Sequence, residues 1–139
     1  MKKMLFPALI SGALAVGLGA FGAHGLKAQV SDPDALRVWH TAVEYQFYHS
    51  LLLVALSFWL DRHPGDAWMA RAGWALGIGM ALFSGSLYLI VACKYVMGMS
   101  GGILSVLGPI TPIGGLSLMA GWLFAAVAVL RTPEQTARG

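Results

Sequence analysis

Four long stretches without Lys, Arg, Asp or Glu dominate the pattern of polar and apolar positions. They run from Met4 to Ala23, from Tyr45 to Leu60, from Ala72 to Cys93 and from Tyr95 to Leu130. A helix needs about 20 apolar residues to cross the roughly 30 Å of hydrocarbon in a bilayer. The pattern therefore predicts four membrane-spanning helices, at about residues 4–26, 33–60, 68–94 and 111–131.

Glycine and proline set the predicted helix boundaries. The last uncharged stretch is too long for one span, and it contains MGMSGG and GPITP, which interrupt helices. The final helix is therefore predicted to start with Thr111 as its cap and Pro112 as its first residue. Residues 97–110 would then lie at the membrane interface or re-enter the membrane shallowly. Asp32 and Pro33 form the same start signal for the second helix.

Composition supports a protein whose solvent is lipid. The chain has 139 residues, which suits one domain, and 58% of them are hydrophobic while only 11% are charged. Soluble proteins have about 25% charged residues. We therefore expect an all-α fold, an integral membrane four-helix bundle formed by residues 1–139 as a single membrane domain.

The basic residues predict the orientation of the bundle, since short cytoplasmic loops accumulate Lys and Arg. One side has Lys2, Lys3, Arg62, Arg71, Arg131 and Arg138, and the other has Lys27, Arg37 and Lys94. Both termini are therefore predicted to be cytoplasmic. The basic residues are scattered over helix ends, so no nucleic-acid partner is expected. A cleaved signal peptide is the rival interpretation of the first stretch, but its apolar region is usually 7–15 residues long and this one continues to about 20.

Small residues recur every four positions and predict helix contacts. Membrane helices associate through close backbone approach at Gly, Ala and Ser, because lipid tails are as apolar as leucine. The predicted contact rows are Ser11, Ala15, Gly19 and Ala23; Gly73, Gly77, Ala81 and Gly85; and Ser117, Gly121 and Ala125. Trp122 falls toward the middle of the fourth helix, where its indole N–H needs a buried acceptor or water.

The sequence WHTAVEYQFYHS at residues 39–50 places polar groups at the start of the second span. Ionisable groups within a membrane cost several kcal/mol unless they find partners, so they mark a functional site by default. We expect one polar cluster near the outer membrane surface, formed with residues of the first and third helices. Its predicted members are His24, His40, Glu44, Tyr45, Gln46, His49, Ser84, Ser86 and Tyr88.

Several uses of this cluster are open. In one interpretation, its hydrogen bonds do no more than fix the register of the helices. In another, His40, Glu44 and His49 relay protons. Haem ligation by His24 and His49 and a metal site at His24, His40 and Glu44 have suitable ligand types. Neither has a specific spacing motif, so no cofactor and no metal are predicted.

The remaining chemistry is sparse. Cys93 is the only cysteine, which excludes a disulfide within the chain. Neither a nucleophile elbow, a phosphate-binding loop nor an HExxH motif occurs. Glu44 is the only acid within a span, so we expect no enzyme.

Four motifs carry a family resemblance: AFGAHGL at 20–26, WHTAVEYQFYHSL at 39–51, FSGSLYL at 83–89, and GPITPIGG followed by GW at 108–122. With them the chain resembles the YgdD/transmembrane protein 256 family, known as domain of unknown function 423. The resemblance implies a four-helix integral membrane protein and no established catalytic or ligand-binding residue. It also places the chain in a bacterial inner membrane. In the family, the segment between SLY and TPIGG is shorter than in this chain, which has an insertion at residues 93–106.

These observations lead to one functional prediction and one alternative. The protein is predicted to be a small structural or accessory component of the membrane, with the lipid bilayer as its partner and with a homo-oligomer or a larger membrane complex as further options. The alternative is a proton-coupled or small-solute transporter or channel that uses the His/Glu cluster.

Overall fold

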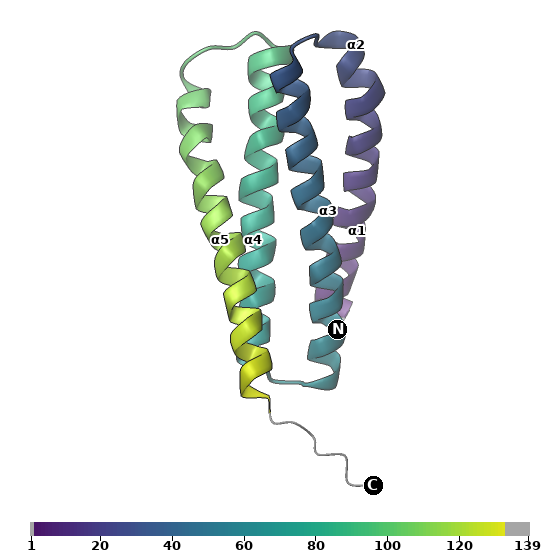
Figure 1. Ribbon diagram of the computed structural model, residues 1–139, viewed down its shortest axis with the longest axis vertical. Coiled ribbons are helices and arrows are strands. Elements are labelled where there is room, and N and C mark those ends of the chain that lie inside the picture. Colours follow the sequence, from purple (N-terminus) through teal and green to yellow (C-terminus); the bar gives the residue numbers. More distant parts are fainter. Residues whose placement is uncertain (1, 133–139) are drawn as a thin grey trace, which may run out of the picture.

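The computed structural model describes residues 2–132, and within that range all regular structure is helical. The four long helices are α1 (Lys2–Phe21), α3 (Pro33–Arg62), α4 (Ala67–Val91) and α5 (Ile103–Arg131). Short segments extend two of them, namely η1 (Gly22–Leu26), α2 (Lys27–Gln29) and η2 (Ala92–Val96). The long helices run alternately up and down (Figure 1), so the predicted all-α four-helix architecture is confirmed. We call the end with the N-terminus and the α3–α4 loop the lower end, and the other the upper end.

Three stretches are long and apolar enough to cross a membrane: Lys3–Gln29, Ala67–Val96 and Ile103–Arg131. The helix α3 is not among them, and polar residues such as Glu44, Gln46 and His49 lower the hydropathy of its central part. Its 30 residues nevertheless extend about 45 Å, which exceeds the hydrocarbon thickness. Because α3 packs between α1 and α4, it lies at the same depth as they do (Figure 1).

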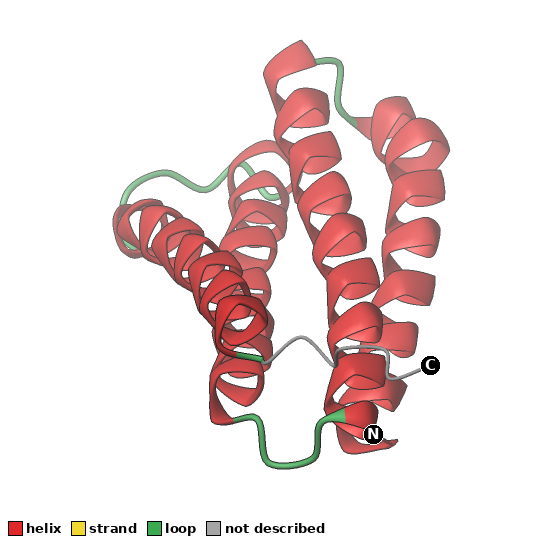
Figure 2. Ribbon diagram, turned by 60° about the horizontal axis from the view of Figure 1, so that its bottom comes forward, coloured by secondary structure: helices red, strands yellow, loops and turns green. Residues whose placement is uncertain are grey.

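Each long helix packs against its neighbour in the chain, in the order α1, α3, α4, α5. Figure 2 shows α1 beside α3, and α5 on the far side of α4. One core cluster joins Leu53 and Leu56 of α3 to Leu76 of α4 and Leu118 of α5. A second cluster, around Trp39 and Val91, closes the upper end. The close packing of α4 with α5 therefore lies on one side of the bundle, and the α1–α3 pair on the other.

The start of α3 agrees with the prediction, whereas the start of α5 does not. The Asp32 carboxylate caps α3 by accepting the Asp34 N–H at 2.8 Å, with Pro33 as the first helical residue. The last helix begins at Ile103 instead of Thr111, and both Pro109 and Pro112 lie inside it.

Packing against α4 explains the longer helix. Each proline removes one backbone hydrogen bond, but neighbouring helices and Ser/Thr side chains compensate for such losses in membranes. Here the Thr111 hydroxyl lies 2.7 Å from the Ser86 hydroxyl of α4. Only residues 97–102 form the connection, where Gly98, Gly101 and Gly102 adopt positive φ angles. The predicted interfacial segment 97–110 is therefore mostly the first turns of α5.

The α3–α4 loop is ordered by Asp66, the N-cap of α4. Its carboxylate accepts the N–H groups of Trp68 and Met69 and the indole N–H of Trp59. Partial burial raises the pKa of Asp66, but hydrogen bonds from Met69, Trp59 and Trp68 and the nearby His63 outweigh this effect and leave the pKa below its usual value. A lowered pKa means that this cap stabilises the fold at neutral pH and loses its effect only as the pH falls through that pKa.

Candidate functional site

Gln46 connects three helices in the membrane-embedded part of the bundle. Its Nε2 donates to the Ser11 carbonyl oxygen of α1 at 3.0 Å, and its Oε1 accepts the Tyr88 hydroxyl of α4 at 2.9 Å. The Ser50 hydroxyl lies 2.7 Å from the Gln46 carbonyl oxygen and 2.9 Å from the Ser11 hydroxyl. We call Ser11, Gln46, Ser50 and Tyr88 the Gln46 cluster. Both ends of the Gln46 amide are thus bonded across helix boundaries.

Trp39 covers the Gln46 cluster on the side of the upper end. Its indole N–H donates to the Leu18 carbonyl oxygen at 2.8 Å, and its ring meets the Tyr88 ring edge to face at 4.7 Å. Gly22 is required for this arrangement, because a Cβ at that position would lie 2.5 Å from the Trp39 ring. The aromatic contact separates the Gln46 cluster from the upper surface.

His49 occupies a second polar contact, which joins α3 to α5. Its Nδ1 lies 2.7 Å from the Tyr45 carbonyl oxygen, and its Nε2 lies 3.3 Å from the Trp122 indole nitrogen. The indole is a donor only, so Nε2 must accept and Nδ1 must carry the proton that Tyr45 accepts. The side chain is 7% exposed. Both of its nitrogens are therefore used, and the acceptor expected for Trp122 is His49.

Two serines of α4 behave differently from each other. Ser86 bonds to Thr111 and thereby joins α4 to α5. Ser84 is 2% exposed, and within residues 2–132 its hydroxyl has no hydrogen-bond partner. Ser84 therefore lies in the same helix face as Tyr88, one turn away, without joining the Gln46 cluster.

Three of the ionisable groups predicted for the same cluster, namely His24, His40 and Glu44, lie outside the Gln46 cluster. His24 is exposed in η1. His40 and Glu44 form a pair with 3.2 Å between Nε2 and Oε1, and their side chains are 73% and 41% exposed. Glu44 also meets the Tyr48 hydroxyl of its own helix at 3.4 Å.

The geometry of α3 explains this correction. At about 100° per residue, Glu44 lies about 200° from Gln46 and therefore on the opposite face. The buried face repeats every three or four positions at Ala35, Trp39, Ala42, Gln46, His49 and Leu53. That repeat was visible in the sequence and could have separated Gln46 and His49 from Glu44. The predicted single cluster is in fact the Gln46 cluster, the His49–Trp122 contact and an exposed His40–Glu44 pair.

Several residues of the predicted small-residue rows lie at contacts between helices. Ala15 is fully buried, Ser11 is bonded to α3, and a Cβ at Gly19 would lie 3.3 Å from Val43 of α3. Ala23 is exposed. In α5, Ser117 donates to the Ala75 carbonyl oxygen of α4 at 2.8 Å. Ala125 packs against the core cluster that contains Leu76 and Leu118.

On α4, the glycine that contacts α5 was missed. A Cβ at Gly79 would lie 2.7 Å from the Leu118 backbone nitrogen, and one at Gly114 would lie 2.5 Å from the Phe83 nitrogen. Gly121 similarly faces Leu76 at 2.6 Å. In the predicted α4 row, Gly73 faces Met4 of α1, Ala81 is exposed, and Gly77 and Gly85 have open space beside them. That row therefore does not form the α4–α5 contact.

Metal binding finds no geometric support within the described part of the chain. No group of three or more His, Cys, Asp or Glu side chains there is arranged to hold an ion. His24, His40 and Glu44, the ligand set considered above, do not form such a group. Several polar groups of residues 2–132, among them Gln46, Ser86 and Ser117, bond one helix to another.

Comparison with known proteins supplies the family. The model of the family described as "Protein of unknown function (DUF423)" matches residues 18–115. The UPF0382 membrane protein YwdK of Bacillus subtilis is 40% identical over 131 residues, covering 94% of this chain and 98% of the relative. A UPF0382 membrane protein of Schizosaccharomyces pombe is 43% identical over 115 residues, covering 83% and 91%. One from Staphylococcus aureus is 37% identical over 131 residues, covering 94% and 98%.

No solved structure matches the chain. The relatives come from bacteria and from a fission yeast, and their names identify them as membrane proteins. The family match, together with identities of 37–43% over most of the sequence, bears out the resemblance seen in the four motifs. This chain is a membrane protein that belongs to the DUF423 family.

Proposed function

We propose that the protein is a non-enzymatic structural or accessory component of a bacterial inner membrane, with both termini in the cytoplasm. The observation that carries this proposal is the use of the polar side chains inside the bundle. Gln46 and His49 each have both ends of their polar groups bonded to other residues of the chain. Polar atoms that are already bonded within the protein are not available to bind or pass on a solute.

The contacts also argue against the relay alternative. A proton path from Glu44 to His49 would have to pass around α3, because the two side chains lie on different faces. His49 would also have to break its bond to Trp122 before Nε2 could accept a proton. His40 and Glu44 bond to each other on the outside of the bundle, so this pair does not lead to His49.

Flux measurements in proteoliposomes separate the two functions. With a pH gradient and a pH-sensitive dye inside the vesicles, we expect the protein to give the same proton leak as vesicles without protein. The Glu44→Gln variant, which keeps hydrogen bonding but removes the titrating charge, should give that same leak. Proton flux that is present in the natural protein and lost in Glu44→Gln would overturn the structural proposal in favour of transport.

The homo-oligomer or larger complex remains part of this proposal. Crosslinking in native membranes, followed by mass determination, would show whether the chain forms an assembly and how large that assembly is. We expect crosslinked species heavier than the 14.7 kDa chain. A chain that stays monomeric under these conditions would remove the assembly from the proposal and leave the flux test unaffected.

A further inference from the structure

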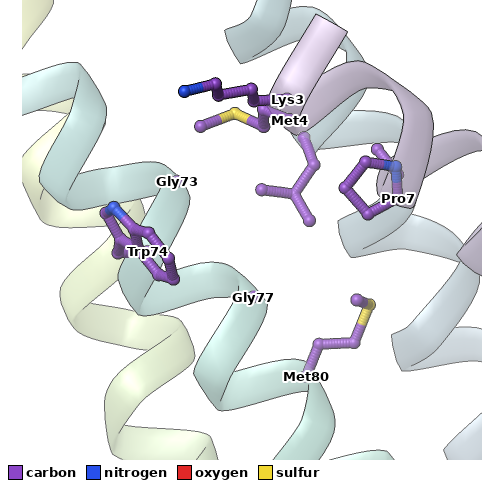
Figure 3. Close-up of a pocket in the computed structure, with 9 residues that line it drawn as sticks. Lys3, Met4, Pro7, Gly73, Trp74, Gly77 and Met80 are labelled. Carbon is purple, nitrogen blue, oxygen red and sulfur yellow. The ribbon is translucent and has the colours of Figure 1, made fainter.

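An apolar groove lies between α1 and α4 near the lower end of the bundle (Figure 3). These helices meet through long side chains rather than through backbone contact: Met4 reaches Gly73, and Met80 reaches Ser11. The space left between them has a volume of about 310 Å³. Its walls are formed by Lys3, Met4, Pro7 and Ala8 of α1, Leu53 of α3, and Gly73, Trp74, Gly77 and Met80 of α4.

The groove combines an apolar wall with one charged group. Lys3 is the only charged residue that lines it, and Figure 3 shows the Lys3 side chain extending toward α4 above the groove. Among residues 2–132, no carboxylate lies within 4 Å of the Lys3 ammonium. Trp74 lines the groove and is 74% exposed, so the groove opens to the surroundings of the bundle. A ligand that fits must therefore have a long apolar part and a negative charge at one end.

The side chains in the groove disfavour a helix as the occupant, because membrane helices associate through close backbone approach. The side chain of Met4 also covers Gly73, which blocks close backbone approach at that glycine. A single hydrocarbon chain needs no such approach.

We propose that this groove binds one acyl chain of an anionic phospholipid, with the lipid phosphate at the Lys3 ammonium. The bilayer around a membrane protein supplies this ligand at high concentration. Basic residues at the surface attract anionic headgroups, while Trp favours the headgroup level. Gly77 leaves the groove open, because it has no side chain and a Cβ at this position would meet open space.

Native mass spectrometry of the purified protein tests the proposal with defined lipids. The protein is equilibrated with phosphatidylglycerol or with phosphatidylcholine of the same acyl chains, and the fraction that retains one lipid is measured. We expect phosphatidylglycerol to be retained about fivefold better, the effect of one basic residue near the headgroup. Lys3→Gln should abolish this preference, whereas Lys27→Gln removes the same charge at the upper end and should preserve it.

Matched variants test the groove itself. Gly77→Leu places a side chain in the groove and should reduce retention of both lipids. Gly85→Leu makes the same change on α4 at another position with open space beside it, and should leave retention unchanged. Inorganic phosphate added in excess should not displace the lipid, because the acyl chain holds it in the groove.

Several results would overturn the proposal. These are equal retention of the two lipids by the natural protein, an unchanged preference in Lys3→Gln, displacement by phosphate alone, or equal effects of Gly77→Leu and Gly85→Leu. A protein dimer that Gly77→Leu dissociates, with no lipid retained, would assign the groove to a second copy of the chain. Should Gly77→Leu fail to fold, the Lys3→Gln and Lys27→Gln pair still decides the outcome.

Discussion

The helix α4 is held on its two sides by different kinds of contact. Toward α5 the backbones come close, because Gly79, Gly114 and Gly121 have no side chain where the other helix lies. Toward α3, apolar side chains such as Leu53 and Leu76 pack together, and the Tyr88 hydroxyl donates to Gln46, whose amide also bonds to α1. We call these the glycine contact and the polar contact.

The difference shows two solutions to one physical problem. Lipid offers no hydrophobic drive for helix association, so van der Waals packing or hydrogen bonding must replace it. Close packing requires small residues at matching positions on both helices, whereas Gln46 can reach two helices across a wider gap. The same wider spacing leaves room for the groove between α1 and α4.

The largest effect is expected for Gly114→Ala in the glycine contact. The new Cβ would lie 2.5 Å from the Phe83 nitrogen, and a backbone atom of a packed helix cannot move aside locally. Overpacking of this kind costs about 1–3 kcal/mol. We expect a corresponding loss in the free energy of unfolding, measured by steric trapping in bicelles.

Gly85→Ala is the matched control for this prediction. It lies on α4 where a Cβ meets open space, so its effect should stay within about 0.5 kcal/mol. If both variants lose the same stability, the close approach of α4 and α5 is not what holds them together.

A smaller effect is expected for Gln46→Leu in the polar contact. The change removes two hydrogen bonds between helices, each worth about 0.6 kcal/mol on average in membranes. The same unfolding measurement should therefore show a loss of about 1–2 kcal/mol, including the cost of the unpaired Tyr88 hydroxyl.

A double-mutant cycle with Tyr88→Phe sharpens this test. The two changes share one bond, so their effects should not add. Tyr48→Phe, which affects only the exposed contact with Glu44 on the same helix, is the control and should change little. Additive effects of Gln46→Leu and Tyr88→Phe would mean that the bond between them contributes nothing to the polar contact.

The smallest effect is expected for Trp122→Phe. It keeps an aromatic ring and removes one hydrogen bond, of 3.3 Å, from the contact between α3 and α5. We expect a loss of about 0.6 kcal/mol in the free energy of unfolding. In addition, NMR of the labelled His49 ring should show the protonated nitrogen at Nδ1 in the natural protein. A proton found on Nε2 would contradict the assigned direction of this bond.

The sequence alone determined the elements of this protein, because their causes are local. Uncharged stretches and the Asp32–Pro33 cap predicted the helices and the start of α3, and the low content of charged residues predicted a membrane protein. The repeat of buried positions in α3 also marks the buried face of that helix. Because Glu44 and His40 lie close to Gln46 in the sequence, however, all three were predicted to share one cluster. Local signals were misleading at Pro109 and Pro112, where packing against α4 outweighs the proline preference and the helix continues.

Only the tertiary structure decided which residues meet. With 18 glycines in the chain, small residues lie on several faces of the helices, and nothing local distinguishes Gly79 from Gly77. The choice depends on where α5 crosses α4, which is a property of two surfaces together. The same is true of Trp122 and His49: the sequence shows that each needs a partner, and the relative position of α3 and α5 makes them partners of each other.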